Sequence, residues 1–204
     1  MKIISKFLRI WQKKGFRKEK KSIKKRKIIF KPPYNYDYTF KIVLLGDPEV
    51  GKANITQKLC YNLFNPSERL VIGVDFHVKK VEVKGKKINM QIWDIAGEQR
   101  FSFLIPTYCL GASAVMIIYD ITNSKTVDKM DNWVEIIREK AGKIPIILIG
   151  NKLDLEKSRE ISREHGIKIA QEYNLSGFKE ISTKTGVNLE KTFEGLSELI
   201  MNRY

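Results

Sequence analysis

The sequence is poor in the side chains that most often bind metals or form cross-links. Its 204 residues contain two cysteines, Cys60 and Cys109, and two histidines, His77 and His165. So few cysteines indicate reduced, buried thiols of an intracellular protein and argue against a disulfide framework. The histidines are far apart in the sequence, which disfavours a histidine-based zinc site or catalytic triad, and we expect both on the surface.

Long apolar runs are also missing. No stretch reaches the ~18 consecutive apolar residues of a membrane-spanning helix, and the N-terminus lacks the apolar core of a secretory signal. We therefore expect an intracellular, cytoplasmic protein that is not secreted. A chain of 204 residues that is 43% hydrophobic, with no visible internal repeat, predicts one folded domain with a tail.

Acidic residues are almost absent from the N-terminal segment. Residues 1–31 hold 14 of the 38 Lys and Arg residues and only one of the 23 acids, Glu19. The other 24 bases and 22 acids nearly cancel, so +13 of the net charge of +15 belongs to this segment. We expect a basic tail with a Pro-containing connector over residues 1–38 and a folded domain over residues 39–204.

Strand and helix patterns alternate along the expected domain. Strand patterns occupy residues 39–46, 74–83, 87–95, 113–121 and 144–152, with a weaker one near 178–181. Helical spacing runs from 52 to 64 through Ile55, Leu59, Leu63 and Phe64, and the segment 188–201 is amphipathic. A Gly-containing turn at 84–86 predicts a hairpin. The pattern predicts a three-layer α/β fold, with a mostly parallel six-stranded sheet and one antiparallel edge hairpin strand.

The run GDPEVGKA (46–53) has the spacing of a phosphate-binding loop but ends in Ala53, where the motif has Ser or Thr. Further motifs follow in order: IGVDF (72–76), WDIAGEQRF (93–101), NKLD (151–154) and STK (182–184). Taken alone, NKLD would also fit an ordinary strand-to-helix loop. Together these motifs resemble those of a Ras-superfamily small GTPase, most closely the Rab type, over residues 39–204. The resemblance implies the P-loop GTPase fold, GTP or GDP and Mg²⁺ as ligands, and GTP hydrolysis.

The resemblance assigns recognition of the guanine base to two loops. The residues concerned are Asn151, Lys152, Asp154, Ser182, Thr183 and Lys184. Asp154 would accept hydrogen bonds from N1–H and the exocyclic amine of guanine, a pairing that adenine does not offer. Lys152 would pack its methylene stem on the purine. Thr183 stands where the family usually has alanine.

The phosphate end departs further from the family pattern. Its expected phosphate-binding residues are Asp47, Pro48, Glu49, Val50, Gly51, Lys52 and Ala53, with Gly97 from the next motif. Lys52 would neutralise the β- and γ-phosphates. Pro48 has no N–H to offer, and Glu49 brings a negative charge to a loop that holds anions.

Two positions that usually supply oxygens to Mg²⁺ lack them. Ala53 replaces a hydroxyl residue, and Val71 replaces the switch I threonine, which leaves Asp94 as the expected metal ligand. We therefore expect Mg²⁺ to bind weakly. Glu98 stands where the family has the water-orienting glutamine, and Gln99 follows one place later. With Glu98, Gln99 and Lys52 as the candidate catalytic residues, we expect slow hydrolysis.

Three aromatic residues, Phe76, Trp93 and Tyr108, occupy the places of an effector-binding patch in Rab-like proteins. Half-exposed aromatic side chains make good anchors for a protein partner. The alternative is that they pack the hairpin against switch II, here residues 93–101. Both interpretations stay open on the sequence alone.

The tail has the pattern of an interfacial helix. Apolar residues Ile3, Ile4, Phe7, Leu8 and Trp11 share one helical face, with cations opposite. The polybasic run that follows favours attachment to anionic lipid. The final residues LIMNRY contain no cysteine, so we expect no C-terminal prenylation and interpret the tail as a replacement anchor. A disordered basic arm and a nucleic-acid-binding arm are the alternatives.

The leading hypothesis is a Rab-like guanine-nucleotide switch, peripheral on a membrane, that hydrolyses GTP slowly or with the help of a partner. Effectors or regulatory proteins would bind at the switches. The alternative is a pseudo-GTPase that serves as an adaptor without hydrolysis. A nucleic-acid-binding role depends on the tail alone and is the least favoured.

Overall fold

The computed structural model of the chain describes residues 35–66 and 71–204. The expected amphipathic helix and basic run of the tail lie outside the described residues. Among the described helices, none is both long and apolar enough to cross a membrane.

A six-stranded sheet forms the centre of the domain, with strand order β2-β3-β1-β4-β5-β6. The strands are β1 (Tyr38–Leu45), β2 (Val74–Val83), β3 (Lys86–Ile95), β4 (Ala114–Asp120), β5 (Ile146–Asn151) and β6 (Gly177–Glu180). β2 pairs antiparallel with β3 at the edge, and the four other pairings are parallel. The predicted α/β fold with one antiparallel edge strand is therefore confirmed.

The β2–β3 hairpin turns at Lys84 and Gly85. Both residues have positive φ, 50° and 73°, and Val83 pairs with Lys86 across the turn. Two-residue turns of this kind match the right-handed twist of the flanking strands, and glycine adopts positive φ at little cost.

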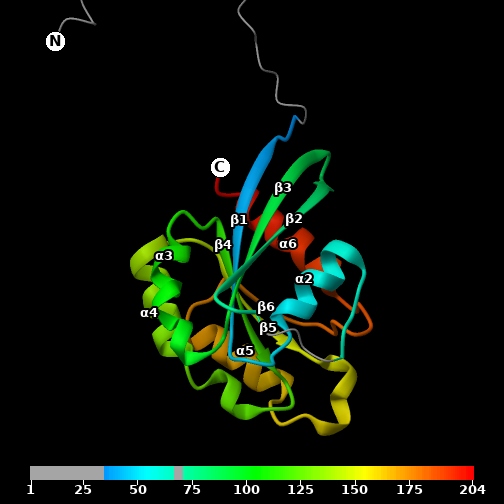
Figure 1. The fold of residues 1–204 in the computed structure, drawn as a ribbon, viewed down its shortest axis with the longest axis vertical. Helices are drawn as coiled ribbons and strands as arrows, with labels where there is room; N and C mark the ends of the chain where they lie inside the picture. The colour runs from blue at the N-terminus through cyan, green and yellow to red at the C-terminus, as the bar shows by residue number, and fades with distance from the viewer. Residues whose placement is uncertain (1–34, 67–70) are drawn as a thin grey trace, which may run out of the picture. The chain divides into compact units, whose positions relative to one another are not determined.

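Helices cover both faces of the sheet. They are α2 (Lys52–Tyr61), α3 (Ile105–Cys109), α4 (Met130–Ala141), α5 (Arg163–Glu172) and α6 (Leu189–Met201), with 3₁₀ turns η1 (Gln99–Leu104), η2 (Ser124–Val127) and η3 (Leu153–Ser158). In Figure 1, α3 and α4 lie to the left of the sheet and α2 and α6 to its right.

Alternation along the strands explains the three layers. Ile42 and Leu44 of β1 pack in the same cluster as residues of α2 and α6, whereas Val43 and Leu45 pack with α3, α4 and α5. The same alternation continues in β4 and β5. Because successive side chains of a strand point to opposite faces, a strand buried on both faces has an almost continuous apolar sequence.

The prediction of one helix over 52–64 is wrong at its C-terminal end. α2 ends at Tyr61, where Asn62 adopts the left-handed conformation and its N–H caps the Gln57 and Lys58 carbonyls. Asparagine tolerates that conformation better than most residues, and the chain leaves the helical path there. Leu63 is consequently 61% exposed, and Phe64 lies in the segment that follows the helix.

Two smaller expectations need correction. The His77 side chain is only 10% exposed, beside Asp75 and Tyr61, so it is not a surface histidine, whereas His165 is exposed. Cys60 and Cys109 are both free thiols as predicted, but only Cys109 is fully buried.

Candidate functional site

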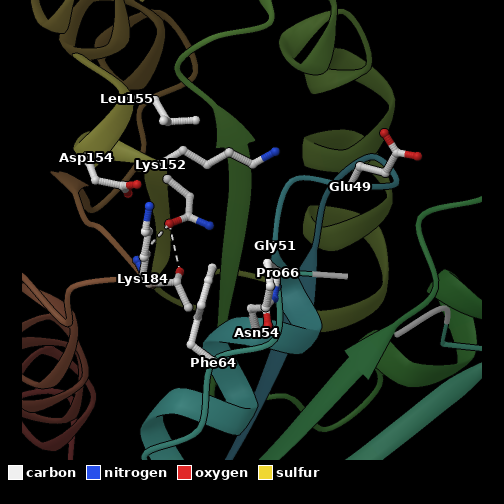
Figure 2. Close-up of a pocket in the computed structure, with 11 residues that line it drawn as sticks. Glu49, Gly51, Asn54, Phe64, Pro66, Lys152, Asp154, Leu155 and Lys184 are labelled. Atoms are coloured by element: carbon white, nitrogen blue, oxygen red, sulfur yellow. Dashed lines mark hydrogen bonds between the residues drawn. The ribbon is translucent and has the colours of Figure 1, made fainter. Parts of the chain in front are cut away.

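A pocket of about 600 Å³ opens beside the first turn of α2 and the end of β5. This volume lies within the range of small-molecule binding pockets. The pocket is lined by Glu49, Gly51, Asn54, Phe64, Pro66, Asn151, Lys152, Asp154, Leu155, Thr183 and Lys184. Figure 2 shows the residues of the NKLD and STK loops on one side and Gly51 and Asn54 on the other. The structure thus brings together five of the six residues assigned to the base.

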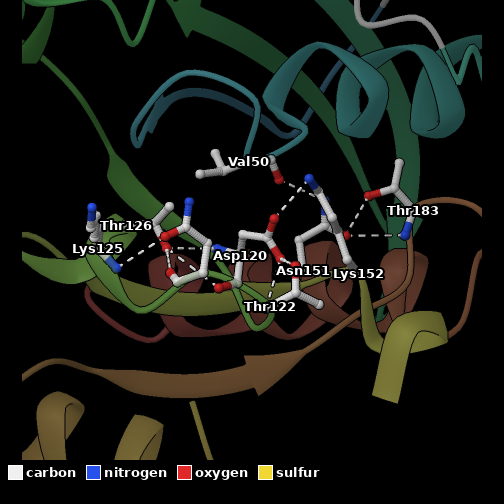
Figure 3. Close-up of polar contacts among 9 residues, drawn as sticks. Val50, Asp120, Thr122, Lys125, Thr126, Asn151, Lys152 and Thr183 are labelled. Carbon is white, nitrogen blue, oxygen red and sulfur yellow. Dashed lines mark hydrogen bonds and ion pairs between the residues drawn. The ribbon is translucent and has the colours of Figure 1, made fainter. Parts of the chain in front are cut away.

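Asn151 joins three loops behind this pocket. Its Nδ2 donates to the Val50 carbonyl oxygen (2.8 Å), and its Oδ1 accepts from the Thr183 backbone N–H (3.2 Å) and hydroxyl (2.7 Å). Figure 3 shows the Asn151 side chain between the phosphate loop and the STK loop. All three residues are buried, so each bond forms away from water and fixes the loops firmly. The threonine in place of the usual alanine adds the hydroxyl bond.

The sixth assigned residue, Ser182, supports Asp154 from behind. Its hydroxyl donates to Asp154 Oδ1 (2.6 Å) and accepts from the Thr185 N–H (3.1 Å). Ser182 is 1% exposed, whereas Asp154 lines the pocket. A carboxylate held in this way presents fixed acceptors to a ligand, which is what bidentate recognition of guanine requires.

Two residues outside the assigned set complete the base end. Asp120, at the end of β4, holds Lys152 through an ion pair (Nζ to Oδ2, 2.8 Å) and accepts from the Thr122 N–H and hydroxyl. Phe64 lines the same pocket as Lys152. The position of Asp120 at the carboxyl end of a buried strand was a usable signal in the sequence. Phe64 was missed because its apolar spacing placed it on the helix.

The phosphate loop has the backbone shape that its motif requires. Gly51 has φ 95°, and Lys52 Nζ donates to the carbonyl oxygens of Gly46 (2.8 Å) and Asp47 (2.7 Å). Lys52 is 7% exposed, so its charge is held inside the loop. Such a loop presents backbone N–H groups and a fixed cation to an anion. Pro48 contributes no N–H to this set.

Glu49 belongs to the phosphate loop, and Gly97 of switch II packs against the same loop. Glu49 is exposed and has φ 64°, in the left-handed region that usually favours glycine. Gly97 lies directly on the loop, because a Cβ added there would come within 2.4 Å of the Asp47 carbonyl carbon and 2.5 Å of the Pro48 nitrogen. Any side chain at position 97 would push switch II away from the loop.

Lys129, which the sequence analysis did not single out, contacts the phosphate loop at Asp47. Its Nζ lies 2.5 Å from Asp47 Oδ1. Lys129 also lines a small cavity of about 60 Å³ with Gly97, Glu98 and Gln99 of switch II. The pair therefore joins the phosphate loop to the segment that precedes α4.

The side chains fit the family's magnesium site poorly. Asp94, at the end of β3, is fully buried and offers carboxylate oxygens. Ala53 in α2 and the half-buried Val71 have no side-chain oxygen. No cluster of three or more His, Cys, Asp or Glu side chains suited to a metal occurs in the described part of the chain. Most of the oxygens that Mg²⁺ prefers would have to come from phosphate and water.

The two candidate water-orienting residues have different surroundings at the start of η1. Glu98 precedes η1, and its carboxylate pairs with Arg100 Nε (2.8 Å). Gln99 is exposed at the first position of η1. Both residues line the small cavity beside Gly97 and Lys129, and the Glu98 carboxylate is held by Arg100.

The three aromatic residues form a connected group. The ring centroids of Phe76 and Trp93 are 4.8 Å apart, and those of Trp93 and Tyr108 are 5.3 Å apart. Phe76 is 45% exposed, while Trp93 and Tyr108 are half-buried against the core. The three side chains thus pack against one another and the core, and part of the group is also exposed on the surface.

Comparison with known proteins agrees with this geometry. Residues 41–202 match the family described as Ras family. The chain is 40% identical to Ras-related protein Rab-8B of Bos taurus over 169 residues, covering 82% of this chain and 81% of that protein. It is 42% identical to Ras-related protein Rab-10 of Caenorhabditis elegans over 167 residues, covering 81% and 83%. The chain therefore belongs to the Ras family of small GTPases and is a Rab-like GTP-binding protein.

Proposed function

We propose that this protein is a guanine-nucleotide switch that binds its nucleotide mainly through the base and hydrolyses GTP slowly. The observation that carries the proposal is the contrast between the two ends of one site. The base end has a complete network through Asn151 and Asp154. The phosphate end lacks side-chain oxygens at positions 53 and 71.

Slow hydrolysis follows from the chemistry of switch II. Phosphoryl transfer depends on positioning a water molecule and on stabilising charge at the γ-phosphate. Glu98 accepts protons but does not donate to the phosphate, and it adds negative charge. Gln99 has the suitable amide but lies exposed on η1. Nucleotide binding without useful hydrolysis, as in an adaptor, is the second candidate and rests on the same residues.

The tail and the aromatic group supply the rest of the proposal. The pattern of Phe7, Trp11 and the polybasic run supports attachment to an anionic membrane surface and hence a peripheral, intracellular location. The exposed part of the aromatic group around Phe76 supports binding of an effector or regulatory protein. The division between tail and folded domain near residue 38 belongs to the same proposal.

Single-turnover GTP hydrolysis tests the proposal. Protein loaded with GTP should convert it more slowly than intact relatives such as Rab-8B, measured side by side. The double variant E98Q/Q99E should raise the rate only partly, because positions 53 and 71 still lack oxygens. A wild-type rate equal to that of the relative would contradict slow hydrolysis. No conversion in either form would favour the adaptor.

A further inference from the structure

Asn54 is a buried polar residue in the first turn of α2 that has no role in the assigned site. It is 6% exposed and lines the nucleotide pocket. Asparagine is a poor residue inside helices, because its amide competes for backbone hydrogen bonds. A buried amide is retained at such a position only when it is hydrogen-bonded.

The amide bonds to the segment that leaves the same helix. Asn54 Oδ1 accepts from the backbone N–H of Asn65 (3.2 Å). The last backbone bond to the helix before this point runs from the Leu63 N–H to the Gln57 carbonyl (3.3 Å). Asn54 therefore extends the attachment of the segment beyond Leu63. Between the two attached positions lies Phe64.

Phe64 is the aromatic residue that lines the pocket. It is 36% exposed in a segment outside any helix or strand, and it lines the pocket with Asp154 and Lys152. An aromatic ring that lines such a pocket is suited to pack against a purine. Holding a loop segment in its bound shape before the ligand arrives lowers the ordering cost of binding.

We propose that Asn54 is a positioning residue for nucleotide retention, which fixes residues 62–66 so that Phe64 faces the bound guanine nucleotide. The Ala53 and Val71 side chains offer no oxygen through which a metal would fasten this side of the pocket. The Asn54 amide provides a direct attachment instead. Asn54 does not act on the phosphates as a catalytic group.

The test is the dissociation rate of fluorescently labelled GDP from full-length protein. Asn54→Ala should release nucleotide roughly three- to tenfold faster, the range for losing one neutral hydrogen bond. Phe64→Ala should also speed release. In the double variant N54A/F64A, the rate should match that of F64A alone, because Asn54 acts through Phe64.

Controls separate positioning from general support of α2. Thr56→Val removes a buried hydroxyl of the same helix, which bonds the Ala53 carbonyl (2.8 Å) and does not line the pocket, and it should leave the rate unchanged. Hydrogen exchange at the Asn65 amide should accelerate in N54A and not in T56V. If N54A fails to fold, Asn54→Leu keeps the branched shape without the acceptor and serves in its place. An unchanged release rate, or equal effects of N54A with and without Phe64, would overturn the proposal.

Discussion

Lys129 Nζ and Asp47 Oδ1 form an ion pair across the junction between α4 and the phosphate loop. Asp47 also accepts a hydrogen bond through its backbone carbonyl from Lys52, so one residue lies between two lysines. The Asp47 side chain is 15% exposed, and its charge would oppose phosphate binding if it were left unpaired. Lys129 therefore neutralises a carboxylate that the loop carries close to its own anion site.

Removing this neutralising cation should weaken nucleotide binding. Lys129→Ala should speed GDP release roughly fivefold, corresponding to about 1 kcal/mol for a partly buried pair. Adding Asp47→Asn should restore most of the wild-type rate, because the uncompensated charge is then gone. Lys125→Ala, at an exposed lysine in η2, is the matched control and should behave as wild type. If the faster GDP release of K129A persists in K129A/D47N, Lys129 affects nucleotide binding by another route than neutralising Asp47.

Guanine specificity should depend on the Asp154 carboxylate. Asp154→Asn replaces one carboxylate oxygen, an acceptor, by an amide donor. That donor would face the donors of guanine, whereas it suits the 2-oxo group of xanthine. We expect GTP affinity to fall by about 10²-fold or more, with a gain for xanthosine triphosphate, as measured by competition against labelled GDP. Asp128→Asn, at an exposed acid, should change neither affinity. Equal competition by ATP and GTP in the wild type would refute the assignment.

Nucleotide release should respond little to removal of magnesium. The side chains of Ala53 and Val71 offer no oxygen to the metal, so chelation removes a weak contribution. The double variant A53S/V71T should acquire metal sensitivity, with release accelerated roughly tenfold or more by chelator. The measurement is GDP release with and without EDTA. A large acceleration in the wild type would mean that the metal is held well by other groups.

The basic tail should bind anionic vesicles, and the folded domain should not. Full-length protein should sediment with phosphatidylserine vesicles, and a form lacking residues 1–31 should remain in solution. High salt should weaken binding without abolishing it, because Phe7 and Trp11 insert apolar area that salt does not screen. F7A/W11A, which keeps every cation, should lose the salt-resistant part. Equal sedimentation of both forms, or preference for RNA at matched salt, would contradict membrane attachment.

The two cysteines should differ in reactivity at mildly alkaline pH. Burial raises the pKa of Cys109 to about 11, and burial also raises the pKa of the half-buried Cys60. The thiolate is the reactive form and both pKa values are raised, so the difference in reactivity comes from access: Cys109 is buried and Cys60 is half-buried. A disulfide reagent should therefore modify one thiol in the native protein and two after denaturation, and Cys60→Ser should remove the native reaction. Native modification of Cys109 at a comparable rate would contradict its burial.

The fold was readable from the sequence because the inner strands β1, β4 and β5 are buried on both faces, whereas the hairpin strands β2 and β3 alternate. Short apolar runs such as 146–149, bounded by turn residues, are typical of buried strands in a chain of alternating helices and strands. The end of α2 was not readable, since Leu63 and Phe64 continue the helical spacing. The left-handed Asn62 ends the helix, and periodicity does not encode that backbone choice.

For the proposed base end, the sequence named the residues and not their contacts. The NKLD and STK motifs gave Asn151, Asp154 and Thr183, whereas the bonds of Ser182 to Asp154 and of Thr183 to Asn151 are seen only in the structure. Lys129 and Asn54 could not be found in this way. Lys129 pairs with Asp47, which is far away in the sequence, and Asn54 bonds to Asn65 beyond the end of α2, and no local pattern marks either pair.

The position of β2 at the edge of the sheet has a consequence for behaviour at high concentration. In the described residues no other strand pairs with its outer side, so backbone groups there could template pairing with a second molecule. Lys79 and Lys80 lie within this strand, and Lys84 begins the turn that follows. Asp75 and Glu82 lie in the same strand, so this edge carries charged side chains along its length. Charged side chains on an edge strand hinder pairing with a second molecule, and we expect the protein to resist edge-to-edge aggregation.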